Sequence, residues 1–338
     1  MAYFLQFLGG ISFFLYGMSV MSKSLRETTG SKMEAVLARM CRTPVRGVIF
    51  GALVTAAIQS SSATTVMVVG FVNARMMTLR HAVGVIMGAN LGTTVTAWLL
   101  SFSGVSGNVP LLNILKPEAL SPLLTAAGVV LLLFGKRQKL QHIGTGLCGF
   151  GILFAGMQAM SNAVAPLAEN AEFSRILTLF ANPVAGILAG AVLTAIIQSS
   201  SASIGILQAL TTTGAVRLGM AVPIIMGQNI GTCVTAMLSG IGTERNAKRA
   251  AFVHLYFNVA GSVILLLVFY LLQFFGVLSA QILMNEGSVA LLHTVFNVAT
   301  TVILLPFYKV LLHAAITTVP DRQRDDGESE KPQIENKI

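Results

Sequence analysis

Long apolar stretches separated by short polar segments make up most of the chain. Seven of them are predicted to cross a bilayer, whose core needs about 20 apolar residues in a helix. They are Tyr3 to Met21, His81 to Phe102, Leu120 to Phe134, Ile143 to Met160, Met220 to Ile241, Ala250 to Phe274 and Ser288 to Leu312. The first has no basic residue ahead of it and no small-residue cleavage site, so we expect a retained helix. The pattern predicts an all-α integral membrane protein.

Composition supports this reading, with 54% hydrophobic residues, 10% charged residues and a mean hydropathy of +0.76. A soluble domain is far less apolar and more charged. The net charge of +9 does not indicate a nucleic-acid partner, because the basic residues lie in short loops between apolar spans. The three cysteines, Cys41, Cys148 and Cys233, have neither metal-ligand spacing nor the even number of a disulfide framework. The expected surroundings are membrane lipid.

One polar insert occurs twice within apolar sequence, and the second copy starts 139 residues after the first. Its members are Gln59, Ser60, Ser61 and Ser62 in the first copy and Gln198, Ser199, Ser200 and Ser201 in the second. Hydrogen-bonding side chains in lipid-like surroundings are costly unless something polar meets them. The duplicated set therefore predicts one shared polar site.

The internal repeat reaches well beyond these serines. At the same offset Gly10 matches Gly149 and Pro44 matches Pro183, and 23 of 51 positions agree between residues 51–101 and 190–240. Such similarity indicates a duplicated structural unit. We therefore predict repeat 1 at residues 1–135, repeat 2 at 140–275, an additional C-terminal helix at 276–318 and a disordered cytoplasmic tail at 319–338.

The distribution of charge predicts how the two repeats face the membrane. The linker Lys23 to Arg46 carries six Lys or Arg residues, whereas its counterpart, Ser161 to Pro183, carries only Arg175. Short basic loops stay in the cytoplasm, so the equivalent linkers are expected on opposite sides. The sequence therefore predicts two inverted-topology repeats.

The same rule favours a re-entrant hairpin at each Gln-Ser-Ser-Ser segment. If Gly47 to Asn73 turns back within the membrane, every strongly basic loop becomes cytoplasmic, the N-terminus lies outside and the C-terminus lies in the cytoplasm. The apolar arm Gly47 to Ile58 has 12 residues, and about 18 Å of helix is too short for a core of about 30 Å. The polar turn would then lie near the membrane centre, where the two tips meet.

A second duplicated motif, Gly88 to Thr93 and Gly227 to Thr232, places two glycines around an asparagine inside a predicted span. Glycine loosens a helix, so we expect both spans to be interrupted there. This adds Asn90, Thr93, Asn229 and Thr232 as secondary candidates for the site. The serines could instead bond to carbonyls one turn back or pack against a neighbouring helix. Two copies of both motifs in fixed register favour a binding site.

Together these motifs resemble the type II sodium-dependent phosphate cotransporter family, over about residues 1–310. The resemblance implies sodium-driven movement of inorganic phosphate, with both ions held by Gln59 to Ser62 and Gln198 to Ser201. The first copy departs from the family pattern, with Gly84-Val85-Ile86 where the second keeps Pro223-Ile224-Ile225. Many bacterial relatives continue into a domain similar to the PhoU regulator, in whose place this chain has a short charged tail.

Charged residues restrict the mechanism. Of 13 acidic residues, six lie in the tail and the others lie in or beside loops, so sodium would need neutral oxygen ligands and the anion would be held by hydroxyls, amides and helix ends. No catalytic, cofactor or metal-cluster motif is present, so we expect no enzyme activity. Two histidines recur with an asparagine four residues on, His254 with Asn258 and His293 with Asn297. They could bond across helices or line a cavity.

The leading interpretation is a symporter of sodium and inorganic phosphate in the bacterial cytoplasmic membrane, working by alternating access. Two alternatives stay open. The same fold could export phosphate, or it could serve as a non-transporting membrane scaffold or sensor. A homo-oligomer is compatible with the sequence.

Overall fold

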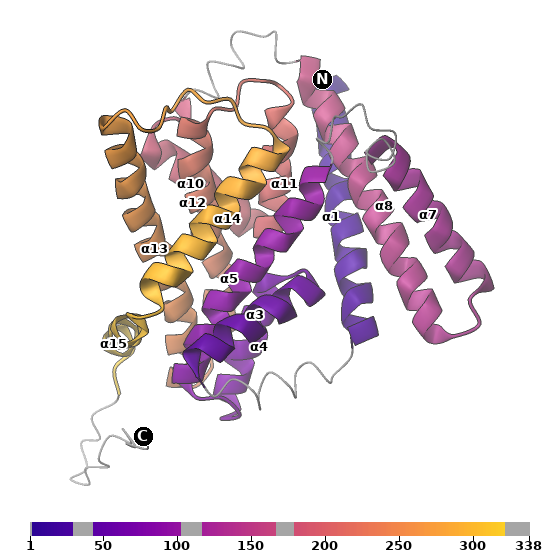
Figure 1. The fold of residues 1–338 in the computed structure, drawn as a ribbon. Coiled ribbons are helices and arrows are strands. Elements are labelled where there is room, and N and C mark those ends of the chain that lie inside the picture. Colours follow the sequence, from indigo (N-terminus) through magenta and orange to yellow (C-terminus); the bar gives the residue numbers. More distant parts are fainter. Residues whose placement is uncertain (1, 30–42, 103–116, 167–178, 322–338) are drawn as a thin grey trace.

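The computed structural model describes residues 2–29, 43–102, 117–166 and 179–321, and its elements are all helices (Figure 1). In chain order they are α1 (Ala2–Thr29), α3 (Pro44–Ile58), α4 (Ser61–Asn73), α5 (Leu79–Ser101), α7 (Pro117–Phe134), α8 (Gln138–Val164), α10 (Pro183–Ile197), α11 (Ser200–Thr211), α12 (Leu218–Ser239), α13 (Arg245–Phe274), α14 (Glu286–Leu304) and α15 (Tyr308–Thr318). No β-strand occurs in these ranges. The predicted all-α class is confirmed.

Six helices of the described residues are long and apolar enough to cross a membrane: α1, α5, α8, α12, α13 and α14. The seventh predicted span, Leu120 to Phe134, falls in α7, whose apolar part Ser121–Phe134 is among the shorter helices. The prediction of one span over Ser288 to Leu312 was wrong, because α14 ends at Leu304 and α15 begins at Tyr308. Pro306, which has no N–H to continue the helix, lies in this break.

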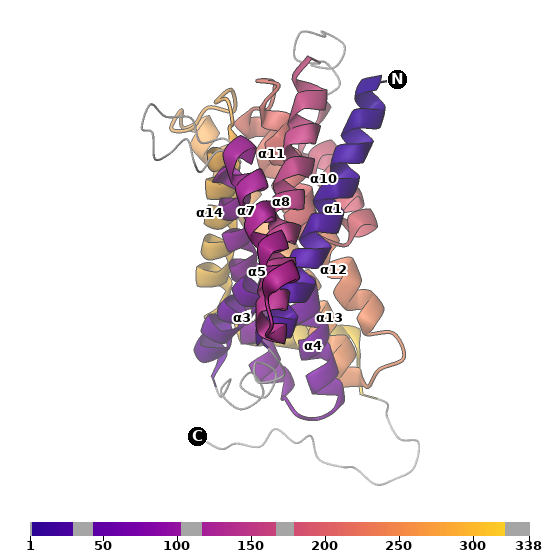
Figure 2. The same cartoon turned by 90° about the vertical axis from the view of Figure 1, so that its right-hand side faces the viewer.

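The repeat-equivalent helices α1 and α8 pack against each other and run antiparallel, with α7 beside α8, as a layer along one side of the molecule (Figures 1 and 2). A Cβ atom at Gly10 would lie 3.0 Å from the carbonyl oxygen of Gly156, and one at Gly17 would lie 2.6 Å from that of Gly149. Gly149 and Gly156 are the repeat equivalents of Gly10 and Gly17. The contact therefore has approximate two-fold symmetry.

Close crossings also join α3 to α5 and α10 to α12. A Cβ atom at Gly88 would lie 2.0 Å from the carbonyl oxygen of Val48, and one at Gly227 would lie 2.0 Å from that of Ile187. Val48 and Ile187 are themselves repeat equivalents. The two crossings thus use the same contact in both copies.

The predicted interruptions at the glycine-asparagine motifs were wrong, because α5 and α12 are continuous through them. Gly84, Gly88 and Gly92 are spaced four residues apart and lie against the backbone of α3. Small residues at this spacing let two helices approach closely. The glycines therefore serve helix packing rather than helix breaking.

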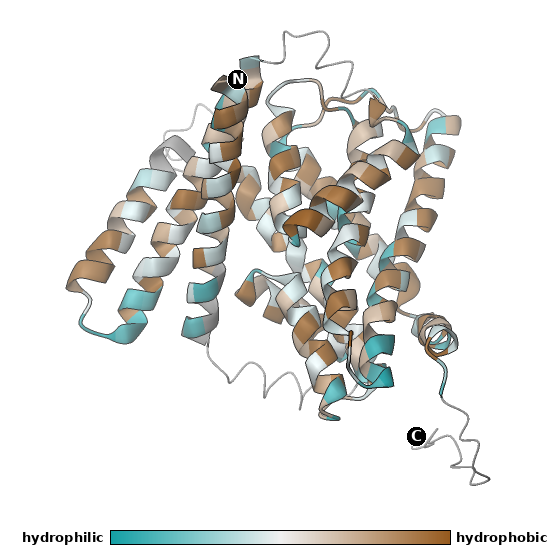
Figure 3. Cartoon of the chain, turned by 180° about the vertical axis from the view of Figure 1, so that it is seen from behind, coloured by the Kyte–Doolittle hydropathy of each residue, from teal (hydrophilic) through white to brown (hydrophobic). Residues whose placement is uncertain are grey.

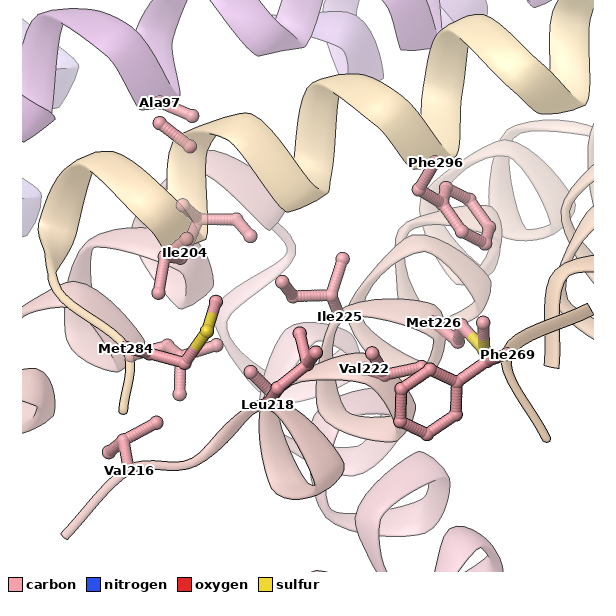
Figure 4. Close-up of a cluster of buried hydrophobic side chains, with 14 residues drawn as sticks. Ala97, Ile204, Val216, Leu218, Val222, Ile225, Met226, Phe269, Met284 and Phe296 are labelled. Atoms are coloured by element: carbon pink, nitrogen blue, oxygen red, sulfur yellow. The ribbon is translucent and has the colours of Figure 1, made fainter. Parts of the chain in front are cut away.

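Two buried apolar clusters have equivalent members. The first includes Val68, Met77, Ala82 and Ile86 with Ala236 and Ala251, and the second includes Leu207, Val216, Ala221 and Ile225 with Ala97 and Ala290 (Figure 4). Ala97 on α5 contributes to the cluster of the second repeat, and its equivalent Ala236 on α12 contributes to that of the first. In the second cluster α14 lies beside the end of α5, and in the first cluster α13 lies in the same way beside the end of α12.

Hydrophilic residues gather at the end of the bundle that carries the α4–α5 turn and the α7–α8 loop (Figure 3). At this end the Arg75 side chain pairs with Glu244, 3.1 Å between Nη2 and Oε1, and the Glu244 carboxylate raises the pKa of the Arg75 guanidinium above its ordinary value. Arg249 pairs with Asp321 at 2.8 Å. The predicted tail, apart from residues 319–321, and most of the two linkers compared for charge lie outside the described residues.

Candidate functional site

The first Gln-Ser-Ser-Ser segment is a sharp break between two helices. The helix α3 ends at Ile58, Gln59 adopts a left-handed conformation (φ 58°, ψ 31°), and the side chain of Ser60 accepts a hydrogen bond from the amide of Ala63 as the N-cap of α4. A left-handed conformation is uncommon for a residue other than glycine. The chain therefore changes direction at the polar insert, within otherwise apolar sequence.

The second segment has the same local geometry. Gln198 is left-handed (φ 57°, ψ 26°), and Ser199 caps α11 by accepting from the amide of Ala202. We call the two helices that flank each turn its arms: α3 and α4 for the first, α10 and α11 for the second. One buried hydrogen bond joins each pair of arms. Thr55 Oγ1 donates to Thr64 Oγ1 at 3.0 Å, and the equivalent Thr194 Oγ1 donates to Ser203 Oγ at 2.8 Å. These cross-arm hydroxyl groups were not among the predicted site residues, although the match of Thr55 with Thr194 was visible in the repeat.

The two turns, which are far apart in sequence, meet in space. The hydroxyl of Ser62 donates to the carbonyl oxygen of Gln198 at 3.3 Å. Around them, the second arm of each pair packs on the long helix of the other repeat, α4 on α12 and α11 on α5. The structure thus brings the two duplicated motifs to one place.

The eight predicted site residues differ in exposure. Gln59, Ser61, Ser200 and Ser201 are buried, Ser60, Ser62 and Ser199 are half-buried, and Gln198 is exposed. Ser61 and Ser200 are the first residues of α4 and α11. The N-terminal end of a helix presents free amide groups and a partial positive charge, which favour an anion.

The glutamine side chains of the two turns differ in their bonding. Thr96 Oγ1 donates to Gln59 Oε1 at 2.8 Å. The equivalent hydroxyl, Thr235 Oγ1, is buried and has no hydrogen-bond partner in the described part of the chain, while the Gln198 side chain is exposed. Two identical sequence motifs therefore hold their glutamines in two different arrangements.

The secondary candidates use most of their polar groups within the helix bundle. Asn90 bonds to α13, whereas Asn229 Nδ2 donates to the carbonyl of Ile225 at 2.9 Å on its own helix. The hydroxyls of Thr93 and Thr232 donate to carbonyls one turn back, at 3.1 and 2.9 Å. This is the ordinary structural bonding of threonine in membrane helices. Of these candidates, Asn90 and Asn229 alone differ between the copies.

A hollow of about 390 Å³ borders the first turn between α1, α3, α5 and α8. Its lining includes Met21, Ala57, Gln59, Leu99 and Phe150. Within the described ranges no group of three or more His, Cys, Asp or Glu side chains could hold a metal ion.

Substituting valine for Thr55 is expected to lower the stability of the protein by about 1 kcal/mol, because a buried hydrogen bond between the arms is lost. Thr194→Val should have a similar effect in the second copy. Thermal unfolding in detergent measures both. Thr317→Val, at an exposed position of α15, is the control, and equal melting temperatures for all four proteins would contradict the role assigned to the cross-arm bonds.

Comparison with known protein families agrees with the duplication. The family model described as Na+/Pi-cotransporter matches residues 13–162 and matches again at 155–291. The same model thus covers each half of the chain, and each match contains one Gln-Ser-Ser-Ser turn.

Several curated proteins are similar to this chain. "Uncharacterized protein YqeW" of Bacillus subtilis is 32% identical over 78% of the chain and 81% of its own length. "Putative inorganic phosphate export protein YjbB" of Escherichia coli is 27% identical over 78% of the chain, which spans 46% of that protein. "Sodium-dependent phosphate transport protein 2A" of Rattus norvegicus is 33% identical over 38% of the chain and 23% of its own length.

No solved structure matches the chain. The family match and six apolar helices make it a multi-pass membrane protein. Membership of a transporter family also supports the expectation that it is not an enzyme. On the evidence of both halves, the chain belongs to the sodium/phosphate cotransporter family.

Proposed function

We propose that the protein couples sodium to the symport of inorganic phosphate across the bacterial cytoplasmic membrane by alternating access, with both Gln-Ser-Ser-Ser turns forming the central site. The observation that carries the proposal is the meeting of two equivalent helix breaks, joined by Ser62 and the Gln198 carbonyl. Irregular backbone inside a membrane is stable only where protein or water surrounds it. A paired set of such breaks is the layout of transporters that bind substrate near the membrane centre.

An inverted arrangement of the two repeats is part of the proposal. It is supported by the antiparallel, approximately symmetric contact of α1 with α8 and by the two equivalent apolar clusters. The helices α3 and α10 have 15 residues each, about 22 Å, which is shorter than a membrane core of about 30 Å. This length favours re-entrant arms. The N-terminus would lie outside, and the C-terminus would lie in the cytoplasm, with the hydrophilic end of the bundle that carries the α4–α5 turn.

The chemistry of the turns suits both ions. Phosphate would be held by serine hydroxyls and by free amides at the starts of α4 and α11, where Ser61 and Ser200 lie. Sodium would take neutral oxygens, such as the Gln59 amide and the carbonyls at the ends of α3 and α10. The substrate's own charge would complete the binding of the cation.

The names of relatives support phosphate as the substrate and leave direction open. A rat relative is named for sodium-dependent phosphate transport, and an Escherichia coli relative is named for phosphate export. Export by the same fold is therefore the second candidate function. A membrane scaffold or sensor would keep the fold without transporting phosphate.

Purified protein in liposomes is expected to take up radiolabelled phosphate when sodium is outside and to take up far less when potassium replaces it. The reason is that the cation supplies the charge that the neutral site lacks. Protein-free liposomes are the control for leakage. Uptake that is indifferent to sodium would contradict the coupling, efflux from loaded vesicles that exceeds uptake would favour export, and no flux in either direction would favour the scaffold.

A further inference from the structure

Two helices that are long enough to cross a membrane carry the same polar pattern, whose role the transport proposal does not assign. His254 and Asn258 lie on α13, and His293 and Asn297 lie on α14, 39 residues later. All four side chains are fully buried. A histidine and an asparagine four residues apart lie on the same face of a helix.

The first set is bonded to the long helix of the first repeat. Asn90 Nδ2 donates to Asn258 Oδ1 at 2.7 Å, and Asn90 Oδ1 lies 3.1 Å from His254 Nε2. The side chain of Asn258 also donates to the His254 carbonyl at 3.0 Å. We call Asn90, His254 and Asn258 the first triad. It ties α13 to α5 within the membrane-spanning part of the molecule.

The equivalent set on the other helices is not bonded in this way. It consists of Asn229, His293 and Asn297, which we call the second triad. Asn229 donates to the carbonyl of Ile225 on its own helix. Both ring nitrogens of His293 and the Oδ1 atom of Asn297 are buried without a partner among the described residues. Buried polar atoms in proteins are normally hydrogen-bonded, so the second triad lacks contacts that the first triad has.

The same asymmetry occurs at the turns. The first copy has the bond from Thr96 to Gln59. In the second copy the Thr235 hydroxyl has no partner in the described part of the chain, and Gln198 is exposed. At the turns and at the triads, these polar contacts are made in the first copy and not in the second, whereas the cross-arm hydroxyl bonds are made in both.

The helices α13 and α14 are packed in similar ways. Beside the ends of α12 and α5, these two helices hold equivalent positions, with Ala251 and Ala290 in equivalent clusters. They cross at Gly261 and Thr300, which are equivalent positions, and a Cβ atom at Gly261 would lie 2.6 Å from Thr300 Oγ1. In the described conformation α13 packs more extensively on α5 than α14 does on α12.

We propose that the two triads are the alternative positions of one lock and that they set which side of the membrane the central site faces. The first triad is bonded in the described conformation, and the second becomes bonded in the opposite one. A packed interface with two discrete arrangements behaves as a two-state element, and losing a contact from one state shifts the population to the other. The inference rests on the proposed alternating access and assigns His254, Asn258, His293 and Asn297 as positioning residues.

The test measures conformation rather than transport. Ala57, which lines the hollow beside Gln59, is replaced by cysteine. The rate at which this cysteine reacts with a water-soluble maleimide is measured in lipid nanodiscs. The rate measured for the protein without the substitution is subtracted, to correct for the native cysteines. His254→Leu removes a contact of the described state, so the rate should change in one direction by about tenfold, the factor that corresponds to one lost hydrogen bond. His293→Leu should shift the rate in the opposite direction. The variant that carries both His254→Leu and His293→Leu should react at nearly the rate of the protein that carries Ala57→Cys alone.

A second pair of variants, Asn258→Leu and Asn297→Leu, keeps the test decisive if a histidine variant fails to fold. Each pair consists of one variant on α13 and one on α14. If the reaction rate changed in the same direction in both variants of a pair, or in neither, the lock would be overturned. Those results would indicate a structural role, or a polar pocket that water or sodium fills. The assay requires no phosphate flux, so failure of the sodium-dependent uptake experiment and failure of the lock remain distinguishable.

Discussion

Replacing Gly88 with alanine is expected to destabilise the protein by about 3 kcal/mol or more, the upper range for overpacking a tightly packed interior. The new Cβ atom would lie 2.0 Å from the carbonyl oxygen of Val48. The obstacle is backbone and cannot change rotamer, so α3 must move away from α5. Thermal or denaturant unfolding in detergent measures the loss.

The second copy supplies a matched experiment. Gly227→Ala should cost a similar amount, because its Cβ would lie 2.0 Å from the carbonyl oxygen of Ile187. Gly70→Ala on α4 is the control, since a Cβ atom there would have no neighbour within 4 Å, and alanine in a helix is neutral or stabilising. If Gly88→Ala unfolded at the same temperature as Gly70→Ala, the close crossing of α3 and α5 would be refuted.

The helix breaks at the two turns could be predicted because the cause is local. Gln59 and Ser60 interrupt an apolar run that is too short to cross a membrane, and serine caps the next helix by bonding to its first amides. The same applies to most long helices, whose extent follows from apolar length alone. The family resemblance was equally visible, because both duplicated motifs are contiguous in sequence.

The role of the glycines could not be predicted, because it depends on a helix that is distant in sequence. A glycine pair around Asn90 is compatible with a broken helix or with a close crossing. The backbone of α3, about 40 residues earlier in the chain, lies against these glycines and makes them a close crossing. The break after α14 is a different case, since Pro306 was visible and the apolar run was extended across it.

The difference between the two copies could not be predicted in any form. Gln59 and Gln198 have the same neighbours in sequence and nearly the same backbone angles, yet one is bonded to Thr96 and the other is exposed. A duplicated sequence specifies the same local backbone in both halves, whereas the side-chain contacts of each turn depend on its tertiary surroundings. The side-chain contacts that differ between the copies therefore have to be read from a structure.

Removing the hydroxyls of Ser61 and Ser200 together is expected to lower sodium-dependent phosphate uptake by about 10- to 100-fold, since a hydrogen bond to a charged group contributes about 1.5–3 kcal/mol. Both serines begin a helix at the meeting point of the turns, where an anion would find hydroxyls and free amides together. Neither is the helix cap, because Ser60 and Ser199 have that role. The double variant Ser61→Ala, Ser200→Ala should therefore fold normally and lose affinity, which initial rates over a range of phosphate concentrations would measure.

Two further variants separate binding from folding. Ser12→Ala removes a serine from an exposed position of α1 and should leave uptake unchanged, whereas Ser60→Ala removes a cap and should lower the melting temperature, with a cost of about 1 kcal/mol. Uptake by the Ser61→Ala, Ser200→Ala protein at the rate of the unmodified protein would show that phosphate binds elsewhere. Because the two hydroxyls come from opposite repeats, each single variant should lose part of the affinity and the two losses should be coupled, as expected for groups that bind one ion.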